Sequence, residues 1–395
     1  MIPREELEQR MRRFRVRLDK DVPNWQVVFL TQKVSLYYLT GTMASGALWI
    51  PRDNEATLFV RKGYERARAE SAFSHIEYMK SYRDMAQKIT LIPSTVHIEK
   101  KAMYMADMEL INRYFLFTEI HSADSSLMFV QSVKTDYEVE RLQKGGAIHA
   151  LVLDDIGPRT LLKEGISEAN LGMQLMSAMV ANGAHGLLRA NMADTDVFGG
   201  YIGFSESTLL PTNFDGPDGV RGLHASAPHL GSPHRLLEKG DLIMVDMACS
   251  FEGYHTDKTS IYLFQGKIPP HVNDIHNQCV TLQLEIAEKL LPGAIPSQIY
   301  EEAIQSLSPS FLKDFMGPGG QTVNFLGHGI GLHLDEFPVI AKNFNEPLQE
   351  NMMIALEPKK AIPGVGMVGT ENTFVVTPKG GVSLTGNQNN IIVCE

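Results

Sequence analysis

The chain has 395 residues, of which 44% are hydrophobic and 21% are charged, so it is long enough for two globular domains with sizeable cores. Its 36 basic and 46 acidic residues give a net charge of −10, which argues against a nucleic-acid or membrane-surface partner, because either requires a basic surface. Three scattered cysteines, Cys249, Cys279 and Cys394, form neither a disulfide framework nor a thiolate metal motif, which predicts a cytoplasmic location.

The first third of the chain alternates short apolar runs with charged helical stretches. The charged N-terminal segment 1–20 lacks the apolar core of a signal peptide, and no apolar run in the sequence reaches the length of a membrane span. A helix is predicted at 64–73 and strands are predicted at 25–31, 46–52, 56–61 and 75–79. We therefore expect an α/β domain at 1–133 without a chemical cluster.

A capping-box signal opens the second domain, which we expect at 134–395. Thr135 and Glu138 have the capping-box spacing before an amphipathic run that predicts a helix at about 136–156. A second helix, capped by Ser167, is predicted to run to about 182.

The order of elements then repeats. A strand pair is predicted at 241–250 and 255–264, joined at Glu252–Gly253. Helices follow at about 273–291 and from Ser297. A second strand pair, at 351–358 and 366–378, is joined through Pro363–Gly364. This order of two helices followed by a hairpin occurs twice, which predicts an α+β domain with a pseudo-twofold internal repeat.

Each predicted hairpin carries two acidic residues in apolar surroundings. With a two-residue turn in the first hairpin, Asp246 faces Thr259, and Asp246 and Asp257 lie diagonally on one face. Glu357 and Glu371 in the second hairpin are 14 residues apart, which permits the same arrangement.

The stretch HGIGLHLDEFP, from His328 to Pro338, cannot be a zinc-binding HExxH helix, because its histidines are five residues apart and glycines interrupt it. If His328 binds a metal, its partners come from elsewhere in the chain. Four buried carboxylates would repel one another without cations. Together with one imidazole they suit a pair of Mn²⁺, Co²⁺, Fe²⁺ or Zn²⁺ ions. Two such ions, ~3.5–4 Å apart, can turn a water into a hydroxide nucleophile at neutral pH.

These residues resemble the ligand set of the pita-bread metallopeptidases, which include methionine aminopeptidase, Xaa-Pro aminopeptidase, prolidase and the non-peptidase creatinase. That set runs Asp, Asp, His, Glu, Glu, and it matches Asp246 and Asp257 in VDMACSFEGYHTD, His328 in GHGIGL, Glu357 in ALEP and Glu371 in GTEN. The segment VVFLTQKVSLYYLTG resembles the creatinase-type N-terminal domain and favours the prolidase branch.

The resemblance implies a pita-bread catalytic domain, two divalent ions per chain, a homodimer and hydrolysis of Xaa-Pro bonds in short peptides. It implies that Glu357 acts as the general base and that His229, in the Pro228–His229 dipeptide, contacts substrate or the developing oxyanion. His224 and His234 are near, so an ordinary loop histidine is an equal interpretation of His229. We expect His333 and Asp335 to line the substrate pocket, and Gly329 and Gly331 to let the backbone approach the metals.

The chain also departs from the family pattern. Asp335 stands where prolidase-like relatives carry a histidine, and His333 stands where they carry a glutamate. Gly369 replaces a frequent arginine, and Asn372 replaces a frequent aspartate. Since an ionised Asp335 cannot donate a hydrogen bond and repels an oxyanion, we expect weak activity on ordinary Xaa-Pro peptides, or a substrate that brings a cationic or donor group.

Two alternatives therefore stay open. The same metal site could serve a small non-peptide substrate, by creatinase-like C–N hydrolysis or by β-elimination, as in the dimethylsulfoniopropionate lyases of this fold. The chain could instead be a non-catalytic binding module, although such relatives tend to lose the ligand set.

Overall fold

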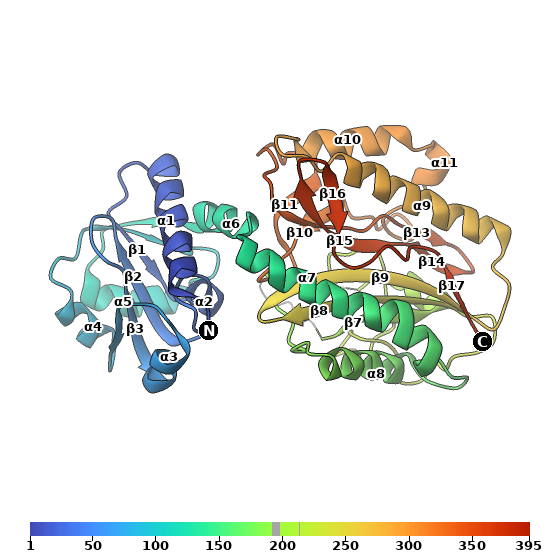
Figure 1. Ribbon diagram of the computed structural model, residues 1–395, viewed down its shortest axis with the longest axis horizontal. Helices are drawn as coiled ribbons and strands as arrows, with labels where there is room; N and C mark the ends of the chain where they lie inside the picture. The colour runs from blue at the N-terminus through green and yellow to red at the C-terminus, as the bar shows by residue number, and fades with distance from the viewer. Residues whose placement is uncertain (192–197, 213) are drawn as a thin grey trace. The chain divides into compact units, whose positions relative to one another are not determined.

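The computed structural model describes residues 1–191, 198–212 and 214–395. The chain forms two compact units, residues 1–131 and 132–395 (Figure 1). The boundary predicted from the sequence lies two residues later, at 133–134. Among the described residues, no helix combines the length and the apolar character needed to cross a membrane.

The first unit is built on a six-stranded mixed sheet in the order β4-β3-β2-β1-β5-β6. Its strands are β1 (Val27–Leu30), β2 (Ser45–Pro51), β3 (Thr57–Lys62), β4 (Ile76–Tyr78), β5 (Thr95–Ile98) and β6 (Glu119–Ser122). Its helices are α1 (Arg4–Asp21), α2 (Lys33–Thr40), α3 (Tyr64–Glu70), α4 (Tyr82–Lys88), α5 (Met105–Phe115) and α6 (Asp124–Ser132), which runs one residue past the unit. The four strands and the helix predicted from sequence are all present.

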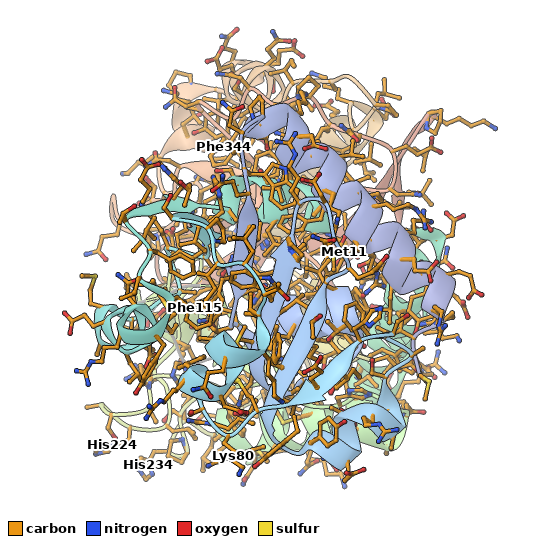
Figure 2. All side chains as sticks on the ribbon, turned by 90° about the vertical axis from the view of Figure 1, so that its left-hand side faces the viewer. Met11, Lys80, Phe115, His224, His234 and Phe344 are labelled. Atoms are coloured by element: carbon orange, nitrogen blue, oxygen red, sulfur yellow. The ribbon has the colours of Figure 1, made fainter. Side chains whose placement is uncertain are left out.

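The core of this unit is strongly aromatic. Phe29 and Trp49 of neighbouring strands pack against Phe115 of α5, with ring centroids 5.4 and 5.8 Å from that of Phe115. Figure 2 shows α1, labelled at Met11, and the end of α5, labelled at Phe115, beside the strands of the sheet. Because strand residues alternate between faces, the fully buried β1 packs on both sides of the sheet.

The second unit contains a nine-stranded sheet whose main path is β11-β10-β12-β15-β9-β8-β7. Its strands are β7 (Gly200–Phe204), β8 (Leu242–Phe251), β9 (Tyr254–Phe264), β10 (Phe325–Gly329), β11 (Glu336–Ala341), β12 (Met353–Leu356), β15 (Glu371–Thr377), β16 (Gly380–Ser383) and β17 (Ile392–Cys394). A separate two-stranded sheet is formed by β13 (Lys359–Ile362) and β14 (Gly366–Gly369), which lies against α9 (Figure 1).

The helices of this unit begin where the sequence predicts them. Thr135 and Glu138 form the full capping box of α7 (Asp136–Ala150), and Ser167 caps α8 (Glu168–Ala181). The helix predicted to run to 156 is an α-helix only as far as Ala150, because the chain widens into a π-helix over Leu151–Leu161, which accommodates Pro158. The second helix pair is α9 (Pro270–Glu288) and α10 (Pro296–Ser306), followed by the short α11 (Pro309–Leu312).

The first predicted hairpin has the predicted register. Glu252 and Gly253 both have positive φ, 46° and 90°, as a two-residue type I′ turn requires. Asp246 therefore pairs with Thr259, and Asp257 lies two residues further along β9 on the same face.

The second predicted strand pair is present, but the prediction that its two strands form one continuous hairpin is wrong. Strand β12 pairs with β15, with Leu356 opposite Asn372, but the chain between them leaves the sheet and forms the β13–β14 hairpin. Pro358 lies at the first break, because proline cannot continue a central strand, and Gly369, with φ +137°, lies at the second. Glu357 and Glu371 consequently flank the point where this hairpin leaves the sheet.

Candidate metal centre

The sheet brings three acidic residues onto one face. Thr259 of β9 pairs with Asp246 of β8 on one side and with Glu371, the first residue of β15, on the other. Asp257 is two residues from Thr259 and so faces the same side of the sheet. Glu357 follows β12 directly, and His328 comes from β10 beyond it. The five predicted ligands are thus brought together from five segments of the chain.

Asp257, His328 and Glu371 come closest to an ion-binding geometry. Each offers a ligand atom, and these atoms lie within 4.8 Å of one another. Nε2 of His328 also lies 3.6 Å from Oε1 of Glu357 and 3.8 Å from Oε1 of Glu371. Nδ1 lies 3.0 Å from the carbonyl of Gly329, so a proton on Nδ1 leaves the Nε2 lone pair facing the carboxylates.

A buried lysine that the sequence analysis missed stands beside this group. The side chain of Lys359 is fully buried, and its ammonium contacts four carboxylates: Asp246 Oδ2 at 2.8 Å, Glu371 Oε2 at 2.9 Å, Glu357 Oε2 at 3.1 Å and Asp218 Oδ1 at 3.3 Å. The signal was available, because a lysine two residues after Glu357 in an apolar strand stays buried only when it is paired. Asp218, in a loop with no periodicity, had no such signal.

When ionised, the four carboxylates around Lys359 carry more negative charge than its single ammonium group neutralises. Burial raises the pKa of Asp257 and Glu357 well above their ordinary values, and repulsion from Glu371 adds to both shifts. Burial also raises the pKa of Glu371, against the opposing effect of Lys359. Burial alone would lower the pKa of Lys359, but the carboxylates outweigh it and raise that pKa. A divalent cation among oxygen ligands and one imidazole fits this donor set.

The centre lines a small cavity in the second unit. His229 and Asp335 line the same cavity, together with Tyr201 and Phe214. His333 is not among the residues that line it in the described part of the chain, and its ring Nδ1 lies 3.8 Å from Glu336 instead. Of the loop histidines near His229, His224 and His234 are exposed at the surface (Figure 2).

Close neighbouring atoms explain why glycine occupies two positions of HGIGLHLDEFP. A Cβ on Gly329 would lie 2.4 Å from the carbonyl oxygen of Phe337 on the neighbouring strand. A Cβ on Gly331 would lie 2.8 Å from Glu336 and 2.8 Å from Lys134, which form a buried ion pair at 2.9 Å. These glycines therefore admit a close strand and an ion pair, and the expectation that they let the backbone approach the metals stays a prediction.

The other two departures from the family pattern also have local partners. Gly369 pairs with Lys359 across the β13–β14 hairpin, and a Cβ there would lie 2.4 Å from the carbonyl oxygen of Pro358. Asn372 accepts a hydrogen bond from the buried Lys258 at 3.2 Å. Lys258 in turn pairs with Asp154 at 3.3 Å, so a neutral asparagine completes a network that already holds one carboxylate.

Comparison with known proteins gives two family matches that divide the chain as the structure does. Residues 10–128 match the creatinase/prolidase N-terminal domain, and residues 140–378 match metallopeptidase family M24. The Xaa-Pro dipeptidase of Pyrococcus furiosus is 25% identical over 367 residues, which cover 92% of this chain and 94% of that protein.

Solved structures match over nearly the full length. The prolidase of Pyrococcus horikoshii superposes with a TM-score of 0.77 at 22% identity, covering 97% of this chain and 100% of that one. The Xaa-Pro dipeptidase of Bacillus anthracis superposes with a TM-score of 0.79 at 19% identity, covering 98% of this chain and 99% of that one.

Proposed function

Because this chain belongs to metallopeptidase family M24, we propose that it hydrolyses Xaa-Pro bonds of short peptides in a reaction that depends on a bound divalent ion. The predicted fold class, an α/β N-terminal domain followed by a pita-bread α+β domain, is confirmed by the family matches and the structural neighbours. The relative named Xaa-Pro dipeptidase, which matches 92% of this chain, supports the substrate class.

The observation that carries the proposal is the group of Asp257, His328 and Glu371 at the wall of the cavity. A divalent ion held by these residues would supply a Lewis acid for the scissile carbonyl and would activate water at neutral pH. The second unit, 132–395, contains all of these residues, and we assign catalysis to it.

Glu357 is our choice for the general base. One of its oxygens, Oε2, accepts a hydrogen bond from Lys359 at 3.1 Å, while Oε1 faces His328. Because Oε1 faces His328 at the proposed ion position, it is suited to take the proton of the attacking water.

His229 and Asp335 would contact the substrate from the cavity wall. His229 can donate a hydrogen bond to the oxyanion that develops on the carbonyl. Asp335 cannot donate when ionised, and its buried Oδ2 has no hydrogen-bond partner among the described residues. A substrate with a cationic or donor group would satisfy that oxygen. His333, which the sequence analysis placed in the substrate pocket, contacts Glu336 instead and would act by holding the loop.

Four finer predictions accompany the proposal. The identity of the ion, one of Mn²⁺, Co²⁺, Zn²⁺ and Fe²⁺, stays a prediction from the donor set. The predicted pair of ions requires a second cation position beside the first. The homodimer and the cytoplasmic location stay predictions from the sequence.

A panel of prolyl dipeptides and tripeptides, assayed with added Mn²⁺, Co²⁺ and Zn²⁺, tests the function. We expect turnover of peptides with a free amine and a proline in the second position, and little turnover when alanine replaces the proline. A folded, ion-loaded protein that cleaves none of the prolyl peptides would favour the small non-peptide substrate to which Asp335 points.

A further inference from the structure

The ammonium group of Lys359 lies inside the carboxylate cluster, in contact with four carboxylates. Its nearest partners are Asp246, at 2.8 Å, and Glu371, at 2.9 Å. Both distances are those of charge-assisted hydrogen bonds. The cation is therefore a built-in member of the site.

We propose that the Lys359 ammonium takes the place of one of two cations, so that the chain binds a single divalent ion, held by Asp257, His328 and Glu371. The inference deepens the proposed function and rests on it for the identity of the site as a metal centre. It replaces the predicted pair of ions by one ion and one fixed positive charge.

The oxygen atoms of the cluster are already divided between two positions. Glu357 and Glu371 each direct Oε2 to the ammonium of Lys359 and hold Oε1 within 3.6 and 3.8 Å of His328 Nε2. The Oε1 side, with Asp257, provides the position for a divalent ion. The Oε2 side, with Asp246 and Asp218, is occupied by the ammonium.

A second divalent ion would have to displace that ammonium. Paired ions lie ~3.5–4 Å apart and share carboxylates, so a second ion bound by Asp246 would lie among the oxygens that Lys359 contacts. The ammonium of Lys359 already contacts Asp246 Oδ2 at 2.8 Å and Glu371 Oε2 at 2.9 Å, so it and a second ion would compete for the same oxygens. Asp246 thus serves the lysine, while Asp257, His328 and Glu371 remain for the ion.

The backbone keeps Lys359 in this position. Strand residues alternate in direction, and Lys360, its neighbour in β13, sends its ammonium the other way, to the carbonyl oxygen of Phe311 at 2.8 Å. Lys359 is held in the hairpin opposite Gly369, and its side chain is fully buried. A withdrawn lysine would leave a buried charge without partners, which is strongly unfavourable.

Metal content measures the inference directly, without reference to activity. The parent protein, loaded with excess Mn²⁺ and dialysed, should contain one ion per chain by elemental analysis and give a single-site titration by calorimetry. Lys359→Ala empties the second position and should approach two ions per chain. Lys360→Ala, the matched control from the same strand, should stay at one. Two ions in the parent, or one ion in folded Lys359→Ala, would overturn the proposal.

A second measurement needs no variant and covers the case in which Lys359→Ala does not fold. Electron paramagnetic resonance of the Mn²⁺-loaded parent should give the six-line signal of an isolated ion. A spin-coupled spectrum of two neighbouring Mn²⁺ ions would refute the inference. Failure of the proposed function can be distinguished from failure of this inference. A protein that binds one ion and cleaves no prolyl peptide would refute the proposed function alone. A protein that binds two ions and cleaves prolyl peptides would refute only the role of Lys359.

Discussion

Lys134→Met should lower the free energy of unfolding by about 3 kcal/mol at pH 7, because it leaves Glu336 as a buried charge without its partner. Lys134 precedes helix α7 by two residues, and its ammonium lies 2.9 Å from Glu336, with side chains 1% and 6% exposed. Glu336 also accepts a hydrogen bond at 3.0 Å from the backbone of His333. The pair therefore fixes the loop that follows His328 and carries Asp335.

The magnitude follows from the pKa of Glu336. Burial alone would raise this pKa, but Lys134 and His333 outweigh it and lower the pKa from 4.5 to about 2. A pKa difference of about 2.5, at about 1.4 kcal/mol for each unit, gives about 3 kcal/mol for the interactions of Glu336 with Lys134 and His333 together, of which Lys134 contributes the largest share. Because the pKa of Glu336 in the folded protein lies below that in the unfolded chain, the stabilisation is complete above pH 4.5 and is lost as the pH falls toward 2.

Urea unfolding of the parent, Lys134→Met, Glu336→Gln and the double variant measures this coupling. Circular dichroism suits the assay, since both tryptophans, Trp25 and Trp49, lie in the first unit and their fluorescence would not follow the second. The double variant should lose much less than Lys134→Met, because it leaves no unpaired charge. A loss below about 1 kcal/mol in Lys134→Met, with the pH dependence of the parent, would refute the assigned role of the pair.

Three further predictions concern the site and the first unit. Asp257→Ala should abolish turnover and Mn²⁺ binding while lowering Tm less than a core deletion does, because it also relieves repulsion; full turnover with metal present would exclude Asp257 as a ligand. Asp335→His should raise kcat/KM on a prolyl dipeptide, whereas a hundredfold loss, about 2.7 kcal/mol, would show that Asp335 already serves peptide hydrolysis. Burial raises the pKa of Glu99 to about 7, so ionisation of this carboxyl opposes folding as the pH rises from 4.5 to 7. Glu99→Gln should therefore stabilise the first unit at pH 8 but not at pH 4. Unfolding followed by tryptophan fluorescence measures this stability, and an equal effect at both pH values would contradict the prediction.

Local rules predicted much of the fold. The type I′ turn at Glu252–Gly253 fixed the register of β8 and β9, and with it the diagonal placement of Asp246 and Asp257. The capping box at Thr135 predicted the start of α7 to the residue. These features depend on neighbouring residues, so a single sequence contains the information that determines them.

The remaining features depend on contacts between distant segments. The departure of β13 and β14 from the main sheet depends on how β15 pairs with β12 and β9, which the strand pattern of 351–378 does not encode. Lys359 and Asp218 are 141 residues apart and meet only in the folded unit. The sequence therefore predicted four of the carboxylates of the cluster, and it missed Asp218 and the positive charge of Lys359 that stands among them.

Metal-dependent hydrolysis of Xaa-Pro bonds is the central claim, and the release of the N-terminal residue from prolyl peptides measures it most directly. Chelator-treated protein, checked for intact secondary structure, should cleave neither a prolyl dipeptide nor a prolyl tripeptide. Restoring a divalent ion should restore cleavage of at least one of them and leave the matched alanyl peptide largely uncut. Undiminished cleavage after removal of the ion, or cleavage of neither prolyl peptide by the folded, ion-loaded protein, would contradict the claim.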